Sequence, residues 1–244
     1  MDRDWTKFYY ADPHPERFVQ EVRQLSENGV LAEPEQALPL ITFLSRVIAA
    51  NPDRVPAWLD ALGDLPQADL HSLDLALWLS GAPTARARLA ERTTDPLFDE
   101  APPDFLGRAI DAPVMLDALW MYYFATGDLR AVRRIISVLE YMSDFGAAES
   151  FRKTAQTDAD RARAMRDAMF QAASWSLGSL MEEHAPLKKY CEGLVRSGDL
   201  TPGEHCALAL VLEKIDPDVW HVEIDPQTSQ ATVRYTPGEA NNPW

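Results

Sequence analysis

The chain lacks the short motifs by which many catalytic sites are recognised. It contains no Gly-Lys-Ser or Gly-Lys-Thr of a phosphate-binding loop and no Gly-x-Ser-x-Gly of a nucleophile elbow. No two of its histidines enclose a glutamate at the spacing of a zinc-binding helix. Glu182, Glu183 and His184 are adjacent, as are Glu204 and His205, but neighbours on a helix point about 100° apart and do not converge on one ion. We therefore expect no catalytic residues, no metal and no cofactor.

Cysteine and long hydrophobic runs are also scarce. The cysteines, Cys191 and Cys206, both stand beside apolar residues in helical patterns, as buried thiols do. A disulfide between adjacent helices is the alternative, and sequence leaves it open. The N-terminus, MDRDWTKFYY, has no apolar core of a signal peptide. The apolar stretch 112–127 is interrupted by Asp117 and is too short to span a bilayer. We expect a cytoplasmic protein.

Basic charge is in deficit. The chain has 23 Lys and Arg against 38 Asp and Glu, a net charge of −15. Every fifty-residue segment except 151–200 is acidic. An acidic surface repels phosphate backbones and anionic lipid headgroups, so we expect no nucleic-acid binding and no membrane binding. Keeping the protein soluble is a sufficient explanation of such a charge.

What the chain does have is a repeated helix-ending tripeptide. Gly-Asp-Leu follows an apolar helical pattern three times, at 63–65, 127–129 and 198–200. Glycine tolerates the left-handed conformation just after a helix C-terminus. Aspartate can accept hydrogen bonds from the first N–H groups of the next helix. Each copy therefore predicts a helix, a tight corner and a second helix.

Other signals place further helix ends. Thr157 is predicted to cap a long helix that Pro186 interrupts, and 201–204 (Thr-Pro-Gly-Glu) has the form of a capping box. Between Pro113 and Gly127 large apolar residues point in every direction, which is typical of a buried central helix; an aromatic ligand groove is the alternative. The proline-rich segment 93–104 is predicted to be a linker and domain boundary, and 105–110 a brief helical turn.

The period changes after Asp216-Pro217. Apolar and polar residues alternate over 220–225 and 231–235, with Pro-Gln-Thr-Ser between them, as in a β-hairpin. An isolated hairpin is barely stable in water, so it must pack on the helices or pair with another strand. The predicted fold is all-α, made of stacked antiparallel helical hairpins (α-solenoid-like) with a small C-terminal β-hairpin. Residues 1–92 and 105–216 form two sets of hairpins, the second packed on the first, and 217–244 form the β-hairpin and a tail.

Part of the chain is internally similar. One set of six residues matches a second set at a constant offset of 46: Leu70, Leu73, Leu77, Gly81, Ala85 and Leu89 match Leu116, Leu119, Tyr123, Gly127, Ala131 and Ile135. The segment Leu116 to Leu139 comes closest to the tetratricopeptide pattern, and the chain resembles the tetratricopeptide-like class of helical-hairpin repeats. That resemblance implies a stack of paired helices that binds peptides or proteins.

Two clusters are candidate contact sites for a protein or peptide partner. Arg161, Arg163 and Arg166 form the one basic cluster of an acidic chain. They are either a solvated helix face that offsets nearby acids or a docking site for an acidic segment. The second cluster lies near the N-terminus and either packs back onto the first helix or forms an exposed recognition arm; it comprises Trp5, Phe8, Tyr9 and Tyr10.

These observations favour a non-enzymatic protein–protein interaction or adaptor module. The second hypothesis is an acidic inhibitor or immunity-type protein that blocks a basic partner through charge complementarity. The third is an enzyme with a site assembled from scattered residues such as Glu182, His184 and Arg166.

Overall fold

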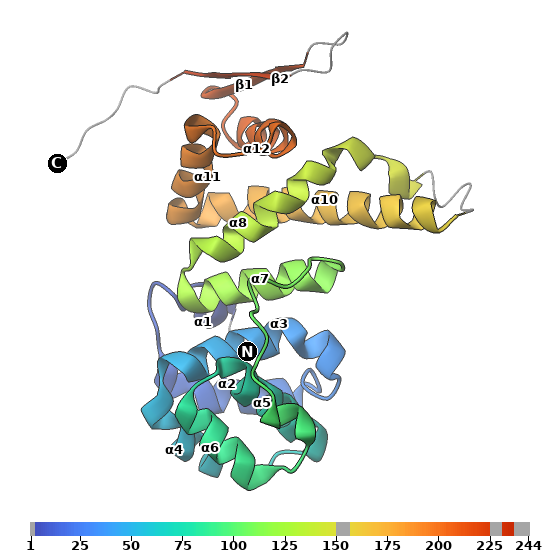
Figure 1. Cartoon of the computed structure of the whole chain (residues 1–244). Coiled ribbons are helices and arrows are strands. Elements are labelled where there is room, and N and C mark those ends of the chain that lie inside the picture. Colours follow the sequence, from blue (N-terminus) through green and yellow to red (C-terminus); the bar gives the residue numbers. More distant parts are fainter. Residues whose placement is uncertain (1–2, 150–156, 225–230, 237–244) are drawn as a thin grey trace, which may run out of the picture. The chain divides into compact units, whose positions relative to one another are not determined.

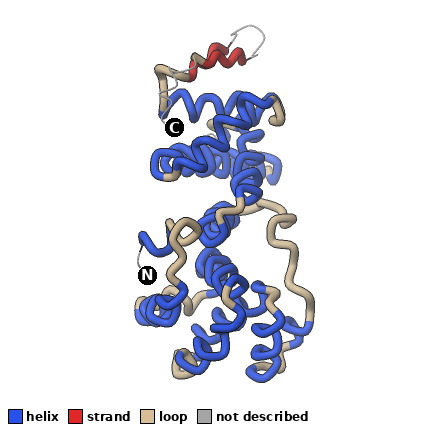
Figure 2. The backbone as a smooth tube through the Cα atoms, turned by 90° about the vertical axis from the view of Figure 1, so that its left-hand side faces the viewer, coloured by secondary structure: helices blue, strands red, loops and turns tan. Residues whose placement is uncertain are grey.

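The computed structural model describes residues 3–149, 157–224 and 231–236. The described chain is α-helical, with one small antiparallel sheet near its C-terminal end (Figures 1 and 2). The predicted fold class, all-α with a C-terminal β-hairpin, is confirmed. The chain divides into two compact units, Met1–Ala131 and Val132–Trp244, and each is described by itself.

The first unit is built around α3 (Pro34–Ala50), which packs against α5 and α7. Residues at many positions around α3 are buried, among them Ile41, Phe43 and Val47. Its other elements are α1 (Arg3–Lys7), η1 (Pro15–Arg17), α2 (Phe18–Glu27), η2 (Pro52–Arg54), α4 (Val55–Ala61), α5 (Gln67–Ser80), α6 (Pro83–Arg92), η3 (Pro96–Asp99) and α7 (Pro113–Thr126).

Helix α7 confirms the prediction made from its apolar circumference. Trp120 is 4% exposed, and Leu116, Leu119, Tyr123 and Phe124 are also buried. The helix ends at Gly127, which has a φ of 69° in the left-handed region that favours glycine. Side chains on all sides of α7 thus contribute to the core.

The second unit contains η4 (Val138–Asp144), α10 (Asp158–Glu183), α11 (Ala185–Ser197) and α12 (Pro202–Ile215). Helix α10 packs against η4 and α12. Its predicted start is confirmed, because the Thr157 hydroxyl accepts a hydrogen bond from the Asp160 backbone N–H at 3.1 Å. Its predicted end before Pro186 is confirmed too, since α10 stops at Glu183 and α11 begins at Ala185.

The start of α12 is held by Glu204. The Glu204 carboxylate accepts the Thr201 backbone N–H at 3.0 Å, while Thr201 Oγ1 accepts the Glu204 N–H at 3.3 Å. This confirms the predicted capping box. The same carboxylate also accepts two hydrogen bonds from the Arg133 guanidinium, at 2.8 and 2.9 Å. Glu204 is only 2% exposed, so one buried side chain fixes both a helix start and the neighbouring segment of α8 (Leu129–Ser137).

The hairpin pairs β1 (Trp220–Ile224) with β2 (Ala231–Tyr235) in antiparallel register, Trp220 opposite Tyr235. It packs on the helices, which is the first of the two arrangements expected for a hairpin that cannot stand alone: β1 contacts α12, and Trp220 is 1% exposed. The Arg196 guanidinium of α11 lies 4.2 Å from the Tyr235 ring centroid and 5.3 Å from that of Trp220. The turn predicted at 226–229 lies outside the described residues.

All three Gly-Asp-Leu copies join two helices, as predicted, but the roles predicted for the glycine and the aspartate hold only in part. Gly127 and Gly198 both take the left-handed conformation after a helix, but Gly63 does not. Asp64 does not cap the next helix either; it forms an ion pair with Arg23 at 2.7 Å, and α5 begins three residues later at Gln67. Of the three aspartates, only Asp128 accepts a hydrogen bond from the backbone N–H two residues later, that of Arg130, at 2.9 Å. The N-cap of α12 is Thr201 and not Asp199.

The segment 93–104 belongs to the first unit, and the division of the chain falls instead inside α8. This segment is tied to the helices before it: Phe98 of η3 is 7% exposed, and Trp78 Nε1 donates to the Glu100 carbonyl at 2.9 Å. Residues 105–107 form a turn and 108–110 are irregular, so the expected helical turn over 105–110 is absent. Proline-rich composition therefore indicated irregular backbone here without marking a boundary.

Candidate functional site

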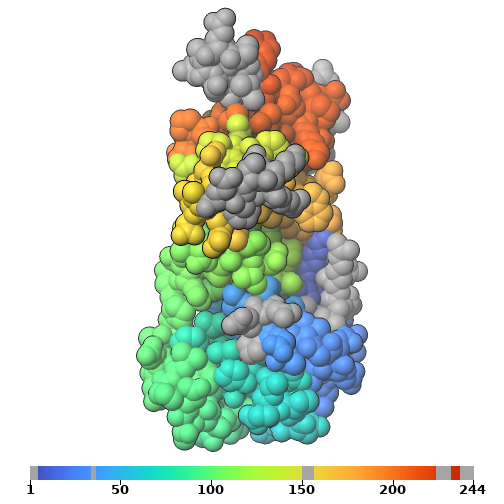
Figure 3. Space-filling model, turned by 90° about the vertical axis from the view of Figure 1, so that its right-hand side faces the viewer, coloured from blue at the N-terminus to red at the C-terminus, as the bar shows by residue number. Residues whose placement is uncertain are grey.

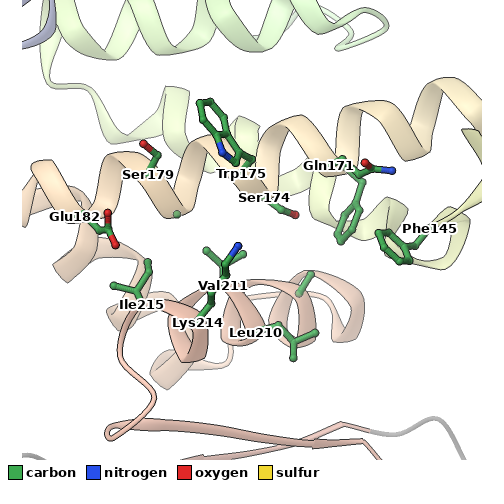
Figure 4. Close-up of a pocket in the computed structure, with 13 residues that line it drawn as sticks. Phe145, Gln171, Ser174, Trp175, Ser179, Glu182, Leu210, Val211, Lys214 and Ile215 are labelled. Atoms are coloured by element: carbon green, nitrogen blue, oxygen red, sulfur yellow. The ribbon is translucent and has the colours of Figure 1, made fainter.

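The second unit contains an apolar groove between α10 and α12 (Figure 4). Its volume is about 550 Å³, within the range of about 300–1,000 Å³ that is usual for ligand sites. We call it the α10–α12 groove. It is lined by Phe145, Phe170, Gln171, Ser174, Trp175, Gly178, Ser179, Glu182, Ala207, Leu210, Val211, Lys214 and Ile215.

The geometry of α10 explains why large side chains stand at the rim. Ala173, Leu177 and Met181 are buried along one side of the helix. Because each residue turns the helix by about 100°, Trp175 lies about 200° from both Ala173 and Leu177, on the opposite side. Trp175 is 73% exposed, and Phe145, which follows η4, is 69% exposed. Side chains of α10 are visible at the surface in Figure 3.

Small residues form the floor of the groove. A Cβ atom on Gly178 would lie 3.7 Å from Val211 Cγ1, so α12 meets α10 closely there without a side chain filling the space. The neighbouring Ser174 is also small, and its buried hydroxyl has no hydrogen-bond partner among the described residues. The hollow therefore results from small residues on α10 that are flanked by larger ones. At one end of the groove, Phe170 packs edge-on against Phe145, with ring centroids 6.0 Å apart.

Charged groups of both signs stand at the two ends of the groove. Next to Phe145, Asp144 accepts hydrogen bonds from Arg166 at 2.6 Å and Arg163 at 3.0 Å. These bonds, that of Arg166 foremost, hold the pKa of Asp144 below its ordinary value against the opposing effect of desolvation. The Asp167 carboxylate also lies at this end, where it accepts hydrogen bonds from the Gln171 side chain at 2.8 Å and from the Ala148 N–H at 2.9 Å. The two guanidinium groups are therefore matched by two carboxylates.

At the other end, exposed Glu182 and Lys214 line the groove together with Ile215 (Figure 4). Helix α10 ends at Glu183 and α12 at Ile215, so the C-terminal turns of both helices meet here. Carbonyl groups at helix C-termini carry partial negative charge. The N-terminus of α11, which begins at Ala185, offsets this charge at the end of α10. The two charged lining residues, Glu182 and Lys214, have opposite signs.

The predicted arginine cluster is largely engaged within the protein. Arg163 and Arg166 bind Asp144, and Arg161 lies 3.7 Å from the Asp158 carboxylate. This arrangement agrees with a helix face that offsets nearby acids. It also places Arg163 and Arg166 on the same face of α10 as Phe170, because the three are separated by three or four residues.

The N-terminal aromatic residues lie in the core of the first unit. Trp5 and Tyr9 are each 3% exposed and pack edge-on against Phe43, with ring centroids 5.2 and 5.6 Å away. Tyr10 is half-buried, 5.1 Å from the Tyr123 ring, and its N–H donates to the Phe124 carbonyl. In this structure the three residues pack onto the helices, and Trp5 and Tyr9 offer no surface to a partner.

The scattered candidates for catalysis do not share a cavity. His184 is 1% exposed at the corner between α10 and α11, Glu182 faces solvent in the groove, and Arg166 binds Asp144. Among the described residues no three His, Cys, Asp or Glu side chains are grouped so that they could hold a metal ion. Cys191 and Cys206 are free, buried thiols, and desolvation raises the pKa of Cys191 to about 12.

A second hollow, on the outer face of η1 and α2, has a different character. Its lining consists of Glu16, Val19, Gln20, Arg23, Gln24 and Glu27. These side chains come from one short stretch of chain, and all but Val19 are polar or charged. Long polar side chains on a single helix are typical of a solvated surface, so the α10–α12 groove is the stronger candidate.

Sequence reasoning missed this groove, although one signal was present. The apolar pattern of the long helix runs through Met169, Ala173 and Leu177, and Trp175 falls outside it. A tryptophan opposite the apolar stripe of an amphipathic helix is unusual, since a residue of that size normally buries much of its surface. Phe145 gave no comparable signal, because no helical pattern surrounds it.

The structure and the comparisons add two general findings. Within the described ranges, no helix combines the length and the apolar character that crossing a bilayer demands. The chain was compared with protein-family models, with curated proteins and with solved structures, and none of the three comparisons gave a match.

Proposed function

We propose that this protein is an interaction module that binds an apolar segment of a partner protein in the α10–α12 groove. The observation that carries the proposal is the exposure of Trp175 (73%) and Phe145 (69%) on the rim of one apolar hollow. Burying apolar surface stabilises a complex by roughly 25 cal/mol per Å². Tryptophan is among the residues that contribute most to protein interfaces.

The lining of the groove supports recognition over catalysis. Its walls are apolar, from Phe170, Leu210, Val211 and Ile215, and its polar groups lie mainly at the floor and at the end that carries Glu182 and Lys214. The high exposure of the two rim aromatics shows that the groove is open to solvent, whereas a small-molecule site usually encloses most of its ligand. An open apolar groove suits a segment of another protein.

The net charge of −15 favours a second candidate function, that of an acidic inhibitor of a basic partner. Salt distinguishes the two. Apolar binding in the groove persists at high salt, whereas attraction between exposed charges weakens steeply as the Debye length falls from about 10 Å at 0.1 M to about 3 Å at 1 M.

A displayed library of random peptides tests the proposed function. Peptides selected on the whole protein are expected to retain binding at 1 M salt and to lose it by at least about tenfold with Trp175→Ala, as for an interface hot spot. Leu97→Ala is the matched control, because Leu97 is also exposed (39%) but lies on η3 in the first unit. The proposal fails if no peptide is enriched or if the selected peptides bind both variants equally.

A further inference from the structure

The pairing of β1 with β2 fixes which backbone groups of the hairpin point away from it. In an antiparallel pair, opposed residues alternate between those that hydrogen-bond to each other and those whose N–H and C=O groups point outward. The Thr236 N–H donates to the Val219 carbonyl at 3.0 Å, so 219 and 236 are a bonded pair. Every second residue from there points its backbone groups outward, among them Trp220 and Val222 of β1 and Val233 and Tyr235 of β2.

The outer edge of β1 is already occupied. The Val222 N–H donates to the Glu213 carboxylate at 3.0 Å, and the Trp220 N–H donates to the Asp216 carbonyl at 3.1 Å. Both donors are groups that the register turns outward, and both acceptors lie on α12 or on the residue that follows it. Helix α12 therefore closes this edge of the sheet (Figure 1).

The outer edge of β2 is open. No hydrogen bond joins the outward N–H and C=O groups of Val233 and Tyr235 to any other residue that the structure describes. The strand contains no proline and one charged residue, Arg234, whereas natural edge strands are commonly protected by proline, by several charges or by a bulge. These outward groups form a row with which an extended strand can pair.

A second copy of β2 fits this row. If the two strands run antiparallel with Val233 opposite its counterpart, Tyr235 lies opposite Ala231 of the second copy, and every outward group within β2 has a partner. Arg234 then lies opposite Thr232 of the second copy, so like charges do not face each other. A register shifted by two residues would either set Arg234 opposite its own counterpart or place Tyr235 beyond the end of the opposing strand.

We infer that β2 pairs antiparallel with β2 of a second copy about a two-fold axis at Val233, so that two hairpins form one four-stranded sheet. Val222 and Val233, which are half-buried and opposed in the hairpin, then form a row of four valines across the sheet. Strand edges alone bury less than the roughly 1,200–2,000 Å² of a stable complex, and the net charge of −15 on each copy opposes their approach. The dimer is therefore weak and gains from salt, which screens this repulsion.

Thr232 tests the register, because its two opposing residues carry opposite charges. It lies opposite Glu223 in its own hairpin and opposite Arg234 of the second copy in the dimer. Thr232→Lys should therefore favour the hairpin but weaken the dimer, and Thr232→Glu should do the reverse. Because the two-fold axis repeats the pair, each variant should shift the dissociation constant of the dimer by roughly 2–30-fold, in opposite directions. Sedimentation equilibrium at about 0.15 M salt measures this constant.

Gln67→Lys and Gln67→Glu are the matched controls, because they change the net charge equally at an exposed position on α5 of the first unit. Through net charge alone, lysine slightly favours the dimer, which is opposite to the effect expected of Thr232→Lys. Val233→Pro removes an N–H that points outward and so breaks no bond within the hairpin, but it should weaken the dimer at least about tenfold. Slow amide exchange of the Arg234 N–H, which faces His221, shows that the hairpin still forms.

A chain that stays monomeric at about 1 mM overturns the inference and leaves the edge of β2 to a strand of another protein. A dimer that is unaffected by Val233→Pro, or that responds to the Thr232 variants as it does to the Gln67 variants, uses another surface and overturns it too. If Val233→Pro unfolds the hairpin, the two Thr232 variants decide alone, since their effects on the hairpin and on the dimer have opposite signs.

Discussion

Helices α7 and α10 each carry a tryptophan, and the two residues have opposite environments. Trp120 on α7 is 4% exposed, whereas Trp175 on α10 is 73% exposed. Helix α7 is largely apolar, with exposed Asp117 as its one charged residue, and most of its side chains are buried in its unit. Helix α10 buries one side, and its opposite side, which carries Trp175, is exposed beside the α10–α12 groove. A buried tryptophan such as Trp120 contributes to stability, whereas an exposed one such as Trp175 is available for contact with a partner.

Replacing Trp120 should give the largest change in the free energy of unfolding. Trp120→Ala removes a buried indole from the core of the first unit and is expected to lower the free energy of unfolding by about 3–5 kcal/mol. Chemical denaturation, followed by circular dichroism, measures it. A loss below about 1 kcal/mol would show that the ring contributes little to the core and would remove the contrast with Trp175.

Substitutions at Glu204 measure how much its buried carboxylate contributes to the stability of the second unit. Glu204→Ala removes the bidentate pair with Arg133 and half of the capping box, with an expected cost of about 1.5–3 kcal/mol, the value of hydrogen bonds to charged groups. Glu204→Gln, which keeps the acceptor for the Thr201 N–H, should cost less. Equal losses in the two variants would mean that the cap adds nothing beyond the ion pair.

Thr201 isolates the cap from the ion pair. Thr201→Ala should cost about 0.5–2 kcal/mol and should speed amide hydrogen exchange in residues 202–205, where the helix start loses its acceptor. Serine at this position keeps the hydroxyl and serves as the control. An unchanged melting curve with unchanged exchange would contradict the observed helix start.

Trp175 should give the smallest change in stability. Trp175→Ala is expected to alter the free energy of unfolding by no more than about 0.5 kcal/mol, as is usual for exposed positions away from special features. The same denaturation measurement as for Trp120→Ala makes the comparison direct. A cost of several kcal/mol would show that the Trp175 ring stabilises the fold and would undermine its role as a contact residue.

Much of the fold could be predicted from local patterns. The capping box at Thr201, the cap at Thr157 and the stop before Pro186 depend on a few adjacent residues, so sequence reveals them. Gly63 and the segment 93–104 were misjudged for a different reason. The pairing of Asp64 with Arg23 and the burial of Phe98 depend on contacts between residues far apart in the chain, which local patterns do not encode.

The candidate site was harder to predict from the sequence than the fold was. The groove joins Phe145, α10 and α12, and its depth depends on how closely α12 approaches Gly178. The basic cluster was visible in the sequence, but its engagement with Asp144 was not, because Asp144 precedes Arg163 by 19 residues. Trp175 alone carried a readable signal, as a large aromatic opposite the apolar stripe.

The two roles of Glu204 restrict how this sequence can change. A capping box accepts either Glu or Gln at its third helical position, whereas two parallel hydrogen bonds from a guanidinium require a carboxylate. Aspartate is one methylene too short to reach both Thr201 and Arg133 from the same place. Positions 133 and 204 are therefore expected to vary together, so that as the sequence diverges a change at one is tolerated only when the other changes with it.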